Sequence, residues 1–91
     1  MKRYLVVLNY YKYGYERDED YRQYESDSIE DCQKAVRKYI TDNEVASSEW
    51  YGGNLYDLEA RKQIGMIAYN GRHIPNMANV GKSTYINILN K

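Results

Sequence analysis

Apolar and polar positions alternate, or run together, in four stretches that predict strands. Residues 3–11, "RYLVVLNYY", are apolar on both faces of an extended chain, which is typical of a central strand. Residues 21–26, "YRQYES", alternate more weakly and predict a second strand with Arg22 and Tyr24 on one side. We expect these two strands to form a hairpin with a long, polar connection.

A helical period replaces the alternation over residues 27–43. The apolar positions that recur at helical spacing are Ile29, Cys32, Val36, Tyr39 and Ile40. Asp27 or Ser28 can cap the helix, and Glu30 stands three residues after Asp27, as a capping box requires. We expect Cys32 to be a buried small hydrophobic residue, and Glu30 to pair with Lys34 one turn later.

Two further strands are predicted in the second half, over residues 50–58 and 63–70, joined by a charged turn. Gly52 and Gly53 inside the first of them indicate a bulge or close packing under the helix. Asn70 and Gly71 favour a tight turn, which would return a short strand over residues 72–74, ended by Pro75.

The order strand, strand, helix, strand, strand predicts one α+β domain over residues 1–91. We expect two layers, an antiparallel sheet of about four strands with one main helix packed on one face. Residues 80–90 fit either a helix or a strand.

Composition adds an unusual use of tyrosine and an uneven spread of charge. The chain has 12 Tyr and no Phe, which favours half-exposed sheet surfaces over a deep aromatic core. The net charge is zero, but residues 16–31 hold eight acidic residues and two arginines, a net of −6. After Glu59 there is no acidic residue, and Arg and Lys give +5.

Several classes of function have little support in the sequence. A single cysteine excludes an internal disulfide, and no apolar run approaches the ~20 residues of a membrane span, so we expect a soluble cytoplasmic protein. His73 is the only histidine, and no metal-ligand spacing or nucleophile motif accompanies it. We therefore expect no enzymatic activity, no catalytic residue, no metal and no cofactor.

The stretch "NVGKST", residues 79–84, resembles the first nucleotide-binding motif of the translation-factor-related GTPases. The resemblance implies that Lys82 contacts phosphate and that Ser83 contacts Mg²⁺. However, Asn76 stands where that motif has its first glycine, and only seven residues follow Thr84. We therefore expect no nucleotide hydrolysis, and retain only an anion-binding site as an open alternative. Its residues would be Gly81, Lys82, Ser83 and Thr84.

The tyrosines and acidic residues of the first third predict a protein-binding surface. Tyr supplies contact area at low entropic cost, and carboxylates would pair with a basic partner surface, as nucleic-acid phosphates do. In size, tyrosine content and acidity the chain is similar to small phage-encoded inhibitors of bacterial defence, such as the anti-CRISPR proteins. That similarity implies a host nucleic-acid-handling protein as the partner. The predicted contact residues are Tyr11, Tyr13, Tyr15, Glu16, Asp18, Glu19, Asp20, Tyr21 and Tyr24.

Two alternatives use other surfaces. The basic end could meet nucleic acid through Arg61, Lys62, Arg72, His73 and Lys82, with Tyr51 or Tyr69 stacking on a base. The acidic segment would repel the same polymer, which argues against this alternative. An edge strand could instead join two copies into a homodimer.

Overall fold

The computed structural model describes residues 2–10 and 22–75. Five strands, one α-helix and one short 3₁₀ helix make up this part of the chain. In chain order they are β1 (Tyr4–Leu8), β2 (Arg22–Ser26), α1 (Ile29–Asp42), the 3₁₀ helix (Ser47–Glu49), β3 (Asn54–Asp57), β4 (Lys62–Ile67) and β5 (His73–Pro75).

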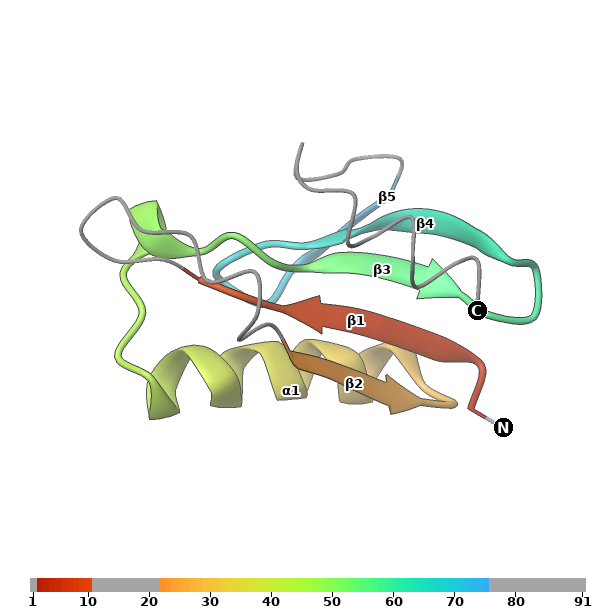
Figure 1. Cartoon of the computed structure of the whole chain (residues 1–91), viewed down its shortest axis with the longest axis horizontal. Coiled ribbons are helices and arrows are strands. Elements are labelled where there is room, and N and C mark those ends of the chain that lie inside the picture. Colours follow the sequence, from red (N-terminus) through yellow and green to blue (C-terminus); the bar gives the residue numbers. More distant parts are fainter. Residues whose placement is uncertain (1, 11–21, 76–91) are drawn as a thin grey trace.

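The strands form one antiparallel sheet in the order β2-β1-β3-β4-β5. Figure 1 shows β2 at one margin of this sheet and α1 beside it, where the helix packs against β1 and β2. The predicted α+β fold with a helix on one face is therefore confirmed. The sheet has five strands instead of about four, because the short returning strand β5 pairs with β4 along its whole length.

The core lies between the sheet and α1. Its buried residues are Val6, Leu8, Cys32, Val36, Ile40, Val45, Leu55 and Ile67. Alternate residues of β1 point to the other face of the sheet, where Leu5 and Val7 form a second buried cluster with Tyr56. Apolar residues on both faces are what a strand between two neighbours needs, so the prediction that β1 is central is confirmed.

The N-cap of the helix lies one residue later than Asp27, the cap that a capping box with Glu30 would require. Ser28 is the N-cap, and its side chain accepts a hydrogen bond from the N–H of Asp31 at 3.3 Å. The capping box predicted at Asp27 is wrong, because the Asp27 carboxylate instead accepts from the N–H of Arg3 at 3.0 Å. The predicted pair of Glu30 with Lys34 is present at 3.8 Å.

The two glycines before β3 allow close contact between backbones. A Cβ atom on Gly52 would lie 2.6 Å from the N of Asn9 and from the O of Val7, and one on Gly53 would lie 2.2 Å from the O of Ile67. Gly53 also has φ +100°, which favours glycine. The close packing is therefore against neighbouring strands. The sequence-based prediction of close packing under the helix is wrong.

Predicted strands are longer than the observed ones in most places. Beyond β1 only a single bridge joins Tyr10 to Trp50, and β3 begins at Asn54 because Gly53 has a conformation that a strand does not use. The β4–β5 connection turns at Gly71, with φ +89°, as predicted. Pro75, expected to end the last strand, is part of β5 and lies opposite Gly65, and the residues after it lie outside the described ones.

The tyrosines that the structure describes are mostly half-buried, as predicted for sheet surfaces. Tyr56 departs from this expectation: it is 1% exposed and belongs to the second buried cluster. Tyr24 departs in the other direction, since at 39% it is the one large hydrophobic side chain classed as exposed among the described residues. Within the same residues, no helix combines the length and the apolar character needed to cross a bilayer.

Candidate functional site

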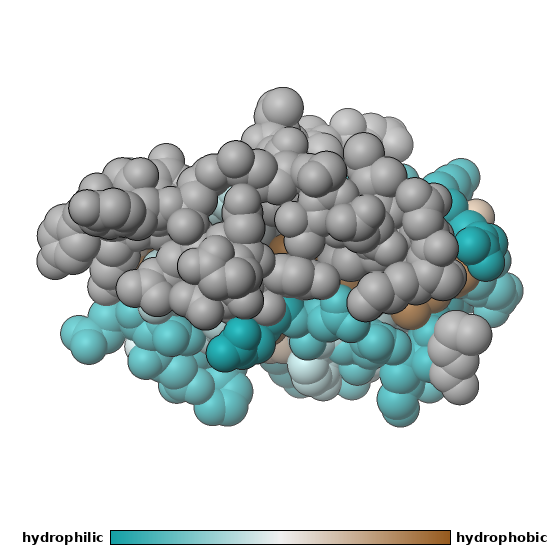
Figure 2. Space-filling view, viewed as in Figure 1, coloured by the Kyte–Doolittle hydropathy of each residue, from teal (hydrophilic) through white to brown (hydrophobic). Residues whose placement is uncertain are grey.

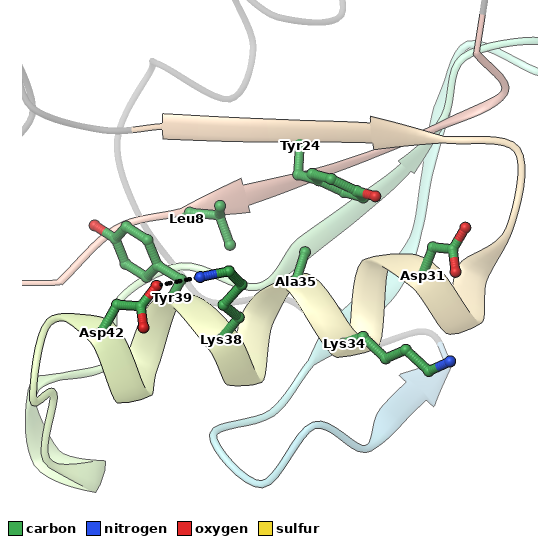
Figure 3. Close-up of a pocket in the computed structure, with 8 residues that line it drawn as sticks. All are labelled: Leu8, Tyr24, Asp31, Lys34, Ala35, Lys38, Tyr39 and Asp42. Atoms are coloured by element: carbon green, nitrogen blue, oxygen red, sulfur yellow. Dashed lines mark hydrogen bonds and ion pairs between the residues drawn. The ribbon is translucent and has the colours of Figure 1, made fainter.

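A groove lies between the edge strand β2 and the helix α1. It has a volume of about 480 Å³. Its lining residues are Leu8, Tyr24, Asp31, Lys34, Ala35, Lys38, Tyr39 and Asp42. Figure 3 shows Leu8 at the back, Ala35 on the helix below, and the Tyr24 ring lying along β2 above Ala35.

Tyr24 faces the helix because of the sheet register. It lies opposite Val6, whose side chain is in the core next to α1, and opposite residues of antiparallel strands share a face. Since β2 is the outermost of the described strands, the Tyr24 ring covers only the rim of that core. Its neighbours Gln23 and Glu25 point to the other face and are exposed.

The groove combines an apolar floor with charged side chains. Lys38 pairs with Asp42 at 2.7 Å, and all four side-chain groups of the two helical ion pairs are more than half exposed. Exposed pairs of this kind are worth about 0.5 kcal/mol, so the lysines can change partners at little cost. In Figure 2 the described surface along the margin of β2 and α1 is mainly hydrophilic, with hydrophobic residues visible only in small patches.

One end of the groove is held by hydrogen bonds between β2 and α1. The Ser26 hydroxyl, which is buried, donates to the Asp31 carboxylate at 3.1 Å and accepts from the N–H of Ser28 at 3.1 Å. These bonds join the last residue of β2 to the first turn of the helix. They hold the strand to the helix at this end of the groove.

Of the contact residues predicted from the sequence, the structure describes only Tyr24. The others, Tyr11, Tyr13, Tyr15, Glu16, Asp18, Glu19, Asp20 and Tyr21, lie outside the described residues, as do Gly81, Lys82, Ser83 and Thr84 of the GTPase-like stretch. Sequence reasoning did not include Leu8, Ala35 or Lys38 in the site. Ala35 and Lys38 lie one helical turn apart on the flank of α1, but only the position of β2 shows that this flank borders a groove.

The basic residues of the nucleic-acid alternative are spread over several elements. Arg61 and Lys62 lie at the β3–β4 turn, and Arg72 and His73 lie at β5, while Lys82 is outside the described residues.

Of the two tyrosines offered for base stacking, Tyr51 and Tyr69, Tyr69 makes contacts that support the fold. The Tyr69 hydroxyl donates to the O of Val45 at 2.9 Å, and the Arg37 guanidinium lies 5.3 Å from the centre of its ring.

His73 lies on β5, opposite Ile67 of β4. Its Nε2 is buried and has no hydrogen-bond partner. No group of three metal-ligating side chains is found in residues 2–10 and 22–75.

Two titratable groups are shifted by their surroundings. Burial raises the pKa of the Cys32 thiol to about 11, and the charge of Asp31 acts in the same direction, so the thiol is uncharged at neutral pH. The N–H of Ala60 donates to the Asp57 carboxylate and lowers its pKa below the usual 3.8, and the bond from Arg3 at 3.2 Å lowers it further. Both groups have structural roles away from the groove.

Comparison with known proteins adds no relative. No protein-family model matches the chain, and no curated protein and no solved structure shows a significant match to it. Function is therefore inferred from the groove itself.

Proposed function

We propose that the protein is a non-catalytic, cytoplasmic protein-binding module, and that Tyr24 and the groove beside it belong to its contact surface. The observation behind this proposal is the exposure of Tyr24, 39%, above a groove of about 480 Å³. Large aromatic side chains at the rim of an apolar pocket are frequent anchors of protein interfaces.

The charges near Tyr24 suit a partner with a basic surface. Glu25, Asp27, Glu30 and Asp31 are exposed and lie where β2 turns into α1. They are the described part of the acidic segment, and their carboxylates would attract Arg and Lys on a partner and speed association. A host protein that handles nucleic acid, the target of anti-CRISPR-type inhibitors, has such a surface, and we propose a protein of this class as the partner.

The experiment compares affinity capture from bacterial lysate by the wild type and by Tyr24→Lys. The control is Ser48→Lys, which adds the same charge at an exposed position of the 3₁₀ helix. We expect a protein that the wild type and the control retain and that Tyr24→Lys loses. Equal retention by all three proteins would exclude Tyr24 from the contact surface. The contribution of the acidic residues before Tyr21 stays a prediction, and charge reversal at Asp18–Asp20 should slow association far more than it alters folding.

A further inference from the structure

The two edges of the sheet differ in their readiness to accept another strand. Among the described residues β5 covers His73–Pro75, and Pro75 has no N–H to donate. A proline on an edge strand is a common means of preventing edge-to-edge pairing. β2 has five residues, contains neither proline nor glycine, and pairs with β1 in an unbroken register. The β2 edge is therefore the one suited to continue the sheet.

Alternation of the hydrogen bonds shows which backbone groups of β2 face outward. On β1, the O atoms of Arg3 and Val7 accept from the N–H groups of Leu58 and Gly53, both at 2.7 Å, on the side of β3. Successive residues of a strand direct their N–H and C=O groups to opposite sides. Val6 therefore directs its backbone groups to β2.

Val6 lies opposite Tyr24, so Tyr24 also uses its backbone groups within the β1–β2 pair. Gln23 and Glu25, on either side of it, direct their N–H and C=O groups away from the sheet. Their side chains are exposed on the face opposite α1. A new strand would thus find two donors and two acceptors at the regular spacing of a β ladder.

We propose that two copies of this chain associate through antiparallel pairing of their β2 strands, with Tyr24 of one copy opposite Tyr24 of the other. A two-fold axis perpendicular to the sheet keeps both helices on the same face. Under that symmetry a residue meets itself or a residue an even number of positions away. Pairing centred on Tyr24 is the register that matches all five residues of β2 with all five of the second copy.

The side chains suit this register. Gln23 lies opposite Glu25 of the second copy, where an amide can donate to a carboxylate, and this contact occurs twice by symmetry. Arg22 lies opposite Ser26 of the second copy, so no like charges face each other directly across the pair. The two Tyr24 rings come together at the centre, where each contacts the other.

The dimer would also change the proposed binding site. The groove between β2 and α1 opens at the edge that the second copy occupies, so the two grooves would face each other across the two-fold axis. Partner binding would then involve a symmetric double groove. Only this last step depends on the proposed function, because the association itself requires no other protein.

The first measurement is the mass in solution. Sedimentation equilibrium from about 10 μM to about 1 mM should show the mass rising from 10.8 kDa toward twice that value. Two variants should remain monomeric over this range. Gln23→Pro removes an outward N–H, and Tyr24→Arg places two cations at the axis. Ser48→Lys should associate like the wild type, and far-UV circular dichroism checks that every variant is folded.

The second measurement tests the register. In a non-hydrogen-bonded antiparallel pair the Cα atoms are about 4.5 Å apart, within the reach of a disulfide. Tyr24→Cys should therefore form a disulfide dimer under mild oxidation, while Gln23→Cys should not, because its two copies lie beyond about 7 Å. The native Cys32 is buried and should leave the wild type uncrosslinked.

Three outcomes would overturn the proposal. A mass of 10.8 kDa throughout, without crosslinking of Tyr24→Cys, would show that β2 does not pair with itself and would leave the proposed function standing. Crosslinking of Gln23→Cys in place of Tyr24→Cys would exclude this register. A dimer that persists in Gln23→Pro would place the contact away from the β2 edge.

Discussion

β1 and β2 run side by side over five residue pairs, yet they have different surroundings. β1 lies between two strands, and its residues from Leu5 to Leu8 are at most 7% exposed. β2 has β1 as its one strand neighbour among the described elements, and its first four residues are exposed. Substitutions at the centre of the sheet should therefore act on stability, and substitutions at β2 should act on association.

The largest loss of stability is expected for Gly53→Ala, next to the sheet centre. The new Cβ would meet the O of Ile67 at 2.2 Å, and φ +100° is unfavourable for alanine. We expect a loss of at least about 3 kcal/mol in the free energy of unfolding, measured by urea denaturation. The control is Gly71→Ala, with φ +89°, whose Cβ meets the movable side chain of Arg37 at 2.9 Å. It should lose only about 1–2 kcal/mol, and equal losses would show that the backbone contact at Gly53 is unimportant.

Leu55→Ala should produce the next largest effect. Leu55 is 0% exposed and lies opposite Val6, so truncation leaves a cavity in the core under α1. The expected loss is about 2–5 kcal/mol, again from urea denaturation. Leu58→Ala removes the same atoms from a half-buried position and should lose about 1 kcal/mol. If both variants lost the same free energy of unfolding, the loss would not depend on the difference in burial between Leu55 and Leu58.

Asp57 should make stability depend on pH in the acid range. Because its pKa in the folded state lies below 3.8, its contribution is present at neutral pH and is lost as pH falls through the folded-state pKa. Comparing urea midpoints at pH 7 and pH 3 should show a smaller acid-induced decrease for Asp57→Asn than for the wild type. Glu59→Gln removes a carboxylate from the same turn and should retain the wild-type decrease. An unchanged decrease in Asp57→Asn would contradict this role.

The smallest effect on stability is expected at the β2 edge. Tyr24→Ser removes an aromatic ring that covers only the rim of the core, so the free energy of unfolding should change by about 0.5 kcal/mol or less. Dimerisation measured by sedimentation should nevertheless weaken by at least about tenfold, because the ring occupies the centre of the contact. A large loss of stability would show that Tyr24 is a core residue, and the contrast between β1 and β2 would then be wrong.

Local patterns were sufficient for much of the fold. The period of 3.6 residues placed α1 to within two residues at each end, and the apolar residues on both faces identified β1 as a central strand. Asn70 and Gly71 indicated the last turn. These features are predictable because they depend on neighbours along the chain or on the simple need to bury apolar side chains.

The candidate site was predicted far less completely. Tyr24 was chosen for its residue type and its acidic neighbours, but Leu8, Ala35 and Lys38 were not associated with it. These three come from two other elements, and their proximity depends on the sheet order and on the angle of α1. Neither property has a signal within a short window of sequence.

By itself, the sequence determined which segments form strands and helix, and which side chains prefer the interior. Only the tertiary structure decided that β2 stands at the end of the described strand order, that Gly52 and Gly53 allow close contact with neighbouring strands, and that Tyr24 lies above a groove. The physical reason is range. Periodicity and capping act over a few residues, whereas the place of a strand in the sheet depends on which distant strands pair with it.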